Sequence, residues 1–302
     1  MSEPYPRDLV GYGGNPPAAS WPNRARLALS FVLNYEEGGE ASVLHGDPAS
    51  EVFLHEIAGN APRVGARDLN VESVYEYGAR AGFWRILRLF TEQRLPLTVY
   101  AVGMALERNP EAGRAMVEAG FEVASHGWRW IDYHEVPEDE ERAHVQRAIA
   151  VIERITGQRP VGWYSGRISP RTRRLVVEEG GFLYDSDSYA DDLPYWVEVQ
   201  GKPHLVVPYT LDNNDMRFAI QNGFDRGEAF FQYLRDGFDV LYAEGARRPK
   251  MMSVGLHCRL AGRPGRAAAL IRFLDYARSH ERVWITTRAE IARHWHRHHP
   301  PP

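Results

Sequence analysis

The stretch LALSFVLNYEEGG, residues 27–39, decides the fold of this chain. Its apolar half, Leu27 to Leu33, predicts a buried strand, and its polar half begins where that strand runs out into a loop. Glu36 and Glu37 therefore lie together at a strand end and are followed by a glycine pair. Burying carboxylates costs free energy that packing does not offset, so the pair indicates a chemical function such as the activation of water.

Strand-like and helix-like segments alternate along the rest of the chain. Repeated β–α units with short connections imply a parallel sheet, and roughly seven or eight of them favour a closed or slightly open barrel. The expected fold class is therefore α/β. Further strands are expected at 97–102, 121–124, 161–164, 182–184, 204–207, 251–256 and 283–286, and helices at 81–93, 110–119, 170–179, 227–245 and 265–280, with a charged helix opening at Pro137.

We expect one domain, residues 25–302, preceded by an irregular arm at 1–24 that is rich in proline and glycine. Residues 40–77 form a long polar insertion in that domain. Its apolar residues, such as Phe53 and Leu54, have no obvious place in a barrel, so the insertion is expected to cover the pocket or, as the pattern favours, to build a subunit contact. The histidine-rich tail from His294 is expected to be exposed.

Composition and charge exclude several classes of protein. The 302 residues are 44% hydrophobic and 25% charged, which is ordinary for a globular protein. A net charge of −4 gives no indication of nucleic acid or an acidic membrane as partner. Cys258 is the only cysteine, which excludes a disulfide framework and a cysteine-based zinc site. No apolar run approaches membrane-spanning length, and the first residues lack the pattern of a secretory signal, so a cytoplasmic location is expected.

Polar side chains recur at the carboxyl ends of the expected strands, where a parallel barrel carries its active site. Any one of them could cap a turn, but their recurrence predicts a common polar pocket. They are Glu36, Glu37, Ser125, His126, Tyr164, Ser165, Arg167, Asp185, Asp187, Tyr209, Thr210, Asp212, Asn213, Asn214 and His257.

The same residues resemble the motifs of the polysaccharide deacetylase superfamily. NYEEG at 34–38 resembles its first motif, Ser125-His126 with Trp130 its histidine metal motif, and VGLH at 254–257 the last motif, which carries the acid histidine. The resemblance spans about residues 25 to 290 and implies a distorted (β/α) barrel of the polysaccharide deacetylase type. More narrowly, LNYEEGGE at 33–40, SHGWRW at 125–130 and PYTLDNNDMRF at 208–218 resemble the allantoinase branch, which hydrolyses cyclic ureides and imides.

The chain departs from the deacetylase motifs at the expected metal site. Glu36 and Glu37 stand for two aspartates, and Trp130 stands for the second metal histidine. A catalytic metal usually has three protein ligands, and only Glu37 and His126 remain. A site without a cofactor is therefore expected. The alternative is a divalent metal at Glu37 and His126, completed by Asp187 or another residue.

Ring-amide hydrolysis without a metal needs a base for water, a donor for the oxyanion and an acid for the leaving nitrogen. Glu36 stands at the family's base position and is the expected general base. Glu37 is expected to raise the pKa of one member of the pair by like-charge repulsion. The alternative is that the two carboxylates face opposite ways and one only forms a salt bridge. His257 is the expected acid; its alternative is a satisfied core histidine.

The residues expected to contact the substrate are His126, Trp130, Tyr164, Asp187, Asn213, Asn214 and Arg217. His126 would orient the substrate or donate to the oxyanion, and Trp130 would fill the volume of the missing metal ligand. The asparagine pair offers the donors and acceptors that the edge of a ureide requires. Each has a plainer alternative: core packing for Trp130, an Asx turn for the asparagines and a solvated face for Arg217.

The expected function is hydrolytic ring opening of a cyclic ureide, allantoin to allantoate in purine catabolism, as the allantoinase resemblance implies. The alternatives are hydrolysis of another cyclic imide, metal-dependent N-deacetylation of acetylated sugars, and ligand binding without catalysis. The missing metal histidine disfavours the deacetylase, and the retention of Glu36 and His257 disfavours the binding protein. The expected partner is a small-molecule substrate, not nucleic acid or a membrane, and the resemblance suggests a homotetramer.

Overall fold

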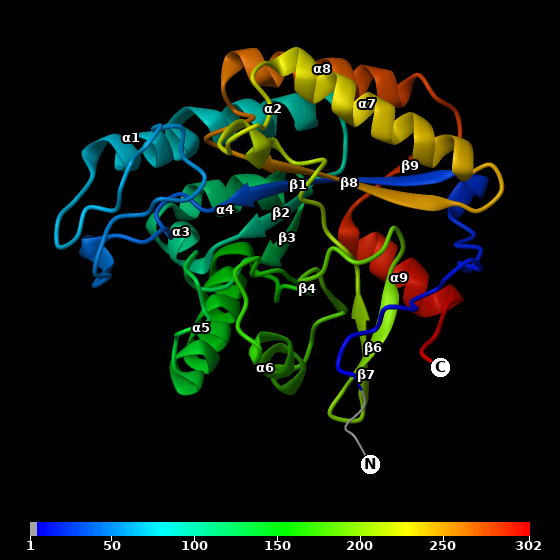
Figure 1. The fold of residues 1–302 in the computed structure, drawn as a ribbon, viewed down its shortest axis with the longest axis horizontal. Helices are drawn as coiled ribbons and strands as arrows, with labels where there is room; N and C mark the ends of the chain where they lie inside the picture. Colours follow the sequence, from blue (N-terminus) through cyan, green and yellow to red (C-terminus); the bar gives the residue numbers. More distant parts are fainter. Residues whose placement is uncertain (1–4) are drawn as a thin grey trace.

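A curled sheet of mostly parallel strands forms the centre of the computed structural model, which describes residues 5–302; the first four residues of the expected arm lie outside it (Figure 1). The strands follow one another in the order β6-β7-β5-β4-β3-β2-β1-β8, and β9 pairs with the amino half of β1. They are β1 (Leu27–Tyr35), β2 (Thr98–Ala101), β3 (Glu122–Ser125), β4 (Gly162–Trp163), β5 (Tyr184–Asp185), β6 (Tyr195–Val199), β7 (Lys202–Val206), β8 (Lys250–His257) and β9 (Val283–Ile285).

Helices cover the outside of this sheet: α2, α7 and α8 lie over β1 and β8, and α5 lies beside β3 (Figure 1). The α-helices are α1 (Leu69–Tyr77), α2 (Phe83–Gln93), α3 (Gly103–Arg108), α4 (Pro110–Glu118), α5 (Glu138–Thr156), α6 (Thr172–Glu179), α7 (Gly227–Glu244), α8 (Pro264–Arg278) and α9 (Arg288–His298). The short helical segments are η1 (Pro22–Arg24), η2 (Val43–His45), the π-helical turn η3 (Gly78–Gly82) and η4 (Asp215–Phe218).

The expected α/β barrel is confirmed in the form of a curled half-barrel. Strand β1 pairs in parallel with β2 and β8, whereas β6 and β7 form an antiparallel hairpin at the far edge. The chain that follows β7 returns toward β8, where Asn214 forms a parallel bridge with Gly255. The carboxyl ends of the parallel strands therefore converge on one end of the half-barrel.

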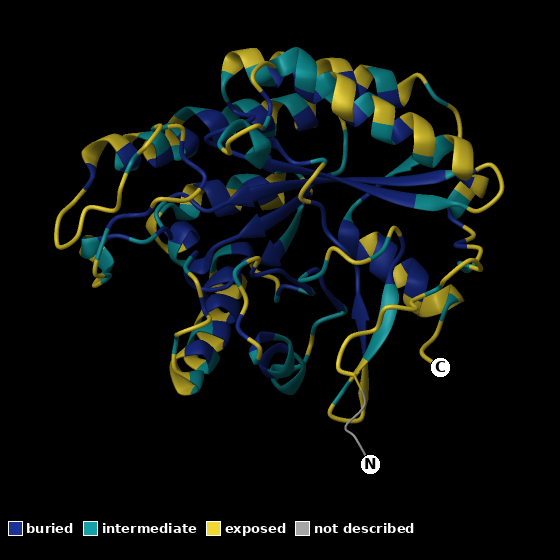
Figure 2. Cartoon of the chain, viewed as in Figure 1, coloured by how far each residue is buried: buried dark blue, intermediate teal, exposed yellow. Residues whose placement is uncertain are grey.

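Alternation along β1 separates the helix-covered core from the inside of the half-barrel. Phe31 packs edge-on against Phe90 and Phe273 of α2 and α8, in the larger core. Val32 belongs to a separate inner cluster with Tyr100, Ala124, Tyr164 and Tyr209. Strand β1 is buried along its whole length, on both faces (Figure 2). Continuing the alternation past Asn34 places Glu36 on the inner side, at the mouth of the half-barrel.

The two ends of the chain pack against each other below the sheet. Trp21 of the N-terminal arm is buried against Trp284 and Trp295. His294, in α9, is also buried and donates to the carbonyl of Ala19 at 2.7 Å. The expectation of an exposed tail is therefore wrong at its first residues, because Trp295 and the arm together complete a small apolar cluster.

The insertion at 40–77 contains η2 and α1 and folds over the carboxyl end of the sheet. Leu54 is buried and joins the main core. Glu51 forms an ion pair with Arg167 at 3.0 Å, and Asp47 pairs with Arg129. The insertion thus lies against the end of the half-barrel, while its two expected roles, covering a pocket and building a subunit contact, stay predictions. No helix within residues 5–302 combines the length and apolar character needed to cross a membrane.

Candidate active site

Glu36 is the centre of a buried polar cluster at the carboxyl end of β1. One of its carboxylate oxygens, Oε1, lies 3.2 Å from Nε2 of His126 and 3.5 Å from Nε2 of His257. Its other oxygen, Oε2, lies 2.7 Å from Nη2 of Arg259. The side chain is 1% exposed. Residues that follow β1 and β3 and residues at the end of β8 therefore meet at one carboxylate, as the pattern of strand ends predicted.

His257 is held in place by Asp215, the first residue of η4. The two side chains meet at 2.6 Å between Nδ1 and Oδ1, and the backbone N–H of His257 donates to Oδ2 of the same carboxylate at 2.8 Å. Burial alone would lower the pKa of His257, but the charges of Glu36 and Asp215 and the hydrogen bonds to them raise it to about 9. His257 is therefore protonated at neutral pH, as an acid requires.

The pKa values of the two glutamates, Glu36 and Glu37, are shifted in opposite directions. Burial alone would raise the pKa of Glu36, but the Arg259 guanidinium and His257 outweigh it and hold that pKa well below its usual range. Burial raises the pKa of Glu37, with Arg259 opposing and the charge of Glu36 adding to the rise. The pKa of one member of the pair is therefore raised, as expected. Burial contributes more to this rise than the like-charge repulsion that was expected to cause it. The raised pKa belongs to Glu37, which leaves Glu36 ionised.

Arg259 joins both glutamates. Its guanidinium lies 3.5 Å from Glu37 through Nη1, in addition to its contact with Glu36. It is fully buried, lies over the rings of Tyr75 at 4.3 Å and Trp130 at 5.2 Å, and donates to the carbonyl of the insertion residue Leu54 at 2.8 Å through Nε. The two carboxylates therefore do not face apart, because one arginine spans them.

Sequence reasoning did not select Arg259 or Asp215. The signal for Arg259 was its place two residues after the strand-end histidine, inside the otherwise apolar string HCRLAG at 257–262. A charge there must be buried and paired if the strand ends where expected. Asp215 followed the asparagine pair and gave no signal that would single it out from a turn residue.

Tyr164 contacts His126, and Asp187 contacts the two residues that follow Tyr164. Nδ1 of His126 donates to the carbonyl of Tyr164 at 3.0 Å, and their rings are 5.1 Å apart. Asp187 accepts from the backbone N–H groups of Ser165 and Gly166 at 2.9 and 2.8 Å. Burial, with the neighbouring charge of Asp185, raises the pKa of Asp187 to about 7.

Three residues expected at the substrate do not contact this cluster directly. The Asn214 side chain donates to the Thr210 carbonyl at 3.1 Å and accepts from the backbone N–H of Met216, so it caps the segment that carries Asp215. Asn213 has a buried side-chain oxygen without a hydrogen-bond partner, beside Gly237 of α7. Arg217 lies over the rings of Phe224 and Tyr233.

The donors around Glu37 and His126 do not fit a divalent metal. Both ring nitrogens of His126 already face oxygens, those of Tyr164 and Glu36. Glu37 accepts from a backbone N–H and faces a cationic guanidinium, and Trp130 offers no ligand atom. Within residues 5–302 no group of three or more His, Cys, Asp or Glu side chains is arranged to hold a metal ion. A site without a metal remains a prediction.

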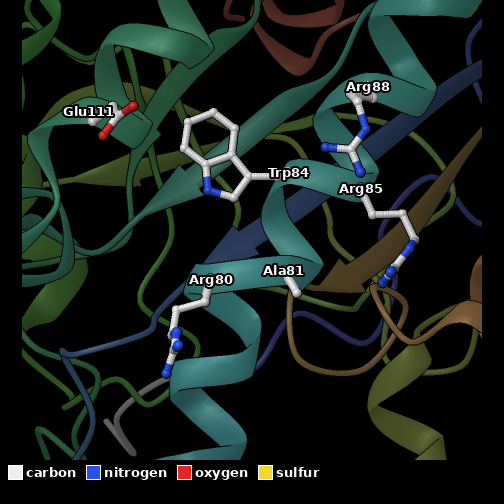
Figure 3. Close-up of a pocket in the computed structure, with 6 residues that line it drawn as sticks. All are labelled: Arg80, Ala81, Trp84, Arg85, Arg88 and Glu111. Carbon is white, nitrogen blue, oxygen red and sulfur yellow. The ribbon is translucent and has the colours of Figure 1, made fainter.

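A hollow lies away from this cluster, on the outside of the half-barrel. It is an open groove of about 500 Å³ along η3 and α2, and it contains none of the residues expected in the site (Figure 3). Three arginines and one tryptophan give it a basic, partly aromatic wall, but the paired acid and base are elsewhere. Its lining residues are Arg80, Ala81, Trp84, Arg85, Arg88 and Glu111.

The half-barrel and its buried carboxylate–histidine cluster define a class of hydrolase, and comparison with known proteins places the chain within it. The polysaccharide deacetylase profile matches residues 66–180. A Schizosaccharomyces pombe protein named "Putative polysaccharide deacetylase" is 46% identical over 314 residues, which cover 97% of this chain and 98% of that protein. This chain therefore belongs to the polysaccharide deacetylase family, as its motifs predicted.

Two solved structures share nearly all of the fold. The structure described as a "probable Polysaccharide deacetylase" from Pseudomonas aeruginosa PAO1 is 63% identical, with a TM-score of 0.97, covering 99% of this chain and 100% of that one. A structure described as PuuE allantoinase is 61% identical, also with a TM-score of 0.97 and the same coverage. The half-barrel is therefore of the deacetylase type.

Proposed function

We propose that this protein is a cyclic amide hydrolase that opens the ring of allantoin to give allantoate. The observation that carries the proposal is the arrangement around Glu36: an ionised carboxylate whose Oε1 lies 3.5 Å from Nε2 of His257, which is protonated. A base and an acid at this separation can serve the two sides of one amide bond. The similarity to a protein described as PuuE allantoinase supports the choice of ring.

The proposed reaction divides the proton transfers between these two residues. Glu36 takes a proton from water as the water oxygen bonds to the ring carbonyl carbon. His126, whose Nε2 lies 3.2 Å from the same carboxylate, orients the ring carbonyl for this attack. The carbon–nitrogen bond then breaks while His257 gives its Nε2 proton to the departing nitrogen. The products are an opened ureide and a carboxylic acid, which becomes a carboxylate by releasing its remaining proton to solvent. Glu36 then passes the proton it took from water to His257, 3.5 Å away, which restores both residues.

Hydrolysis of another cyclic imide would use the same groups and differs only in the ring that fits. Metal-dependent N-deacetylation of acetylated sugars is the function that the names of two relatives suggest. The guanidinium beside Glu37 and the indole of Trp130 both oppose it, because that chemistry needs a metal where these groups lie.

The test is turnover of allantoin by purified protein, followed as release of allantoate, before and after exhaustive chelation with metal content assayed. We expect turnover that survives chelation in protein containing less than about a tenth of an equivalent of metal. The same preparation is assayed on hydantoin, succinimide and chitin oligomers. Turnover of chitin oligomers that chelation abolishes, without turnover of any ring, would replace the proposal with the deacetylase.

A further inference from the structure

The positive charge nearest to Glu36 and Glu37 is the guanidinium of Arg259. Arg259 places Nη2 2.7 Å from Glu36 and Nη1 3.5 Å from Glu37, and its guanidinium lies over the indole of Trp130. By the motif resemblance, Glu37 and Trp130 stand at two of the three positions that bind metal in the deacetylase pattern. The guanidinium therefore lies among the residues that would otherwise surround a metal.

We propose that Arg259 is a positioning residue that replaces the divalent cation of this site: it holds Glu36 and Glu37 in place, neutralises them and excludes a metal. The inference rests on the proposed function for its kinetic part only. The part that concerns Arg259 in place of a metal between Glu36 and Glu37 does not depend on the identity of the substrate.

Contacts with neighbouring residues fix the guanidinium of Arg259 between Glu36 and Glu37. Its Nε is fixed by the carbonyl of Leu54, and Tyr75 lies under its plane at 4.3 Å. Both contacts come from the insertion at 40–77, so the segment that lies against the end of the half-barrel also supports its cation. A buried guanidinium is costly unless it is paired, and here two carboxylates and two aromatic faces share it.

The alignment of the contact between Arg259 and Glu36 also indicates that Arg259 does more than neutralise charge. The Nη2 atom of Arg259 and Oε2 of Glu36 are close but are not aligned as a full hydrogen bond, and both count as buried atoms without a hydrogen-bond partner. Oε2 of Glu36 can therefore still accept an aligned hydrogen bond or a proton while it is paired with Arg259. A bidentate arginine would hold that carboxylate with two aligned bonds and compete with its work as a base.

Arg259→Ala tests the inference, with guanidinium chloride and urea as small-molecule probes. We expect kcat on the cyclic ureide to fall about 100-fold, as for loss of one stabilising group, with KM changed less than threefold. Millimolar guanidinium should restore at least a tenth of the lost kcat. Urea has a similar shape without the charge and should restore nothing. Arg171→Ala is the matched control, because Arg171 pairs with buried Glu141 at 3.4 Å outside the site.

Zinc affinity is the readout that needs no substrate. We expect chelator competition to show Zn²⁺ bound at least tenfold more tightly by Arg259→Ala than by the unaltered protein, and the gain to disappear in Arg259→Ala/Glu37→Gln. Equal zinc affinities, or absence of guanidinium rescue in a protein that opens the ring, would each overturn the inference. If the unaltered protein opens no ring, the proposed function fails and the zinc comparison alone decides.

Arg259→Lys keeps the test decisive if the alanine variant does not fold. Lysine retains one positive charge but cannot reach both glutamates with separate nitrogens. We expect this variant to fold, to exclude zinc as the unaltered protein does, and to lose about tenfold in kcat. Zinc binding by the lysine variant, or full activity in it, would show that the site does not depend on a guanidinium cation.

Discussion

Glu36 carries three contacts with positively charged or protonatable groups: His126 and His257 at Oε1, and Arg259 at Oε2. Replacement by glutamine keeps the shape of the side chain and removes the proton acceptor. We expect Glu36→Gln to lower kcat by about 10³-fold, within the range for loss of general-base catalysis, while binding of the substrate measured by calorimetry changes little. Unaltered turnover would remove Glu36 from the mechanism.

The control for this change is Glu141→Gln. Glu141 is also 1% exposed, and it accepts hydrogen bonds from Ser169 and Thr172 far from the cluster. Loss of activity in both variants, together with equal losses of thermal stability, would mean that Glu36 acts only through the fold.

Glu36 and Asp215 together raise the pKa of His257. In the unaltered protein, kcat/KM should decline as pH rises through about 9, because His257 must be protonated to act as an acid. Asp215→Asn removes a negative charge that raises the pKa of His257, so that pKa falls. The alkaline limb of the pH profile should move to lower pH by about one unit.

His204→Gln serves as the comparison, since His204 forms a similar buried pair with Asp185 at 3.0 Å but does not touch His257. Its alkaline limb should match that of the unaltered protein. An Asp215→Asn profile that coincides with the unaltered one would mean that another group limits activity at high pH.

At the scale of elements, the π-helical turn η3 between α1 and α2 lets a helix pass unusually close to the site. A Cβ on Gly78 would lie 2.3 Å from Oε1 of Glu37, and one on Gly82 would lie 1.9 Å from the carbonyl of Cys258. Turns of this kind often mark functional positions. Gly78→Ala should therefore displace Glu37 and lower kcat/KM at least tenfold, although alanine favours helix by about 1 kcal/mol.

Gly265→Ala is the matched substitution in α8, where an added Cβ meets nothing within 4 Å. It should change kcat/KM less than twofold and leave the melting temperature equal or higher. A Gly78→Ala variant with normal kinetics would show that Glu37 can move without consequence.

Elements with strong periodicity could be predicted from the sequence, and contacts between distant segments could not. The apolar stripe of α5 and the run 27–33 gave their elements directly, and the strand ends correctly brought Glu36, His126 and His257 together. Helix α1 was hidden in a segment rich in polar residues, and strand β6 is recognisable only by its pairing with β7. Arg259 was missed because its partners come from β1 and from the insertion, and no local pattern reports a pairing across 222 residues.

At the scale of the whole molecule, residues of the insertion have two kinds of surroundings. Leu54 and Tyr75 contact Arg259, whereas other apolar side chains of the insertion are exposed to solvent. Val64 is 79% exposed and Leu69 is 65% exposed. Exposed apolar groups that gather on one projecting segment are typical of a subunit contact, which agrees with the homotetramer suggested by the motif resemblance.

We expect light scattering to give the unaltered protein a mass near four times the 34.4 kDa of one chain, and the double variant Val64→Asp/Leu69→Asp to give a smaller species, because burying two carboxylates in an apolar contact is costly. Val240→Asp on α7, where the side chain is 58% exposed, is the control and should not change the mass. Because the same insertion holds Arg259 through Leu54 and Tyr75, dissociation should also lower kcat. A monomeric unaltered protein, or an unchanged mass in the double variant, would contradict this assignment of the insertion.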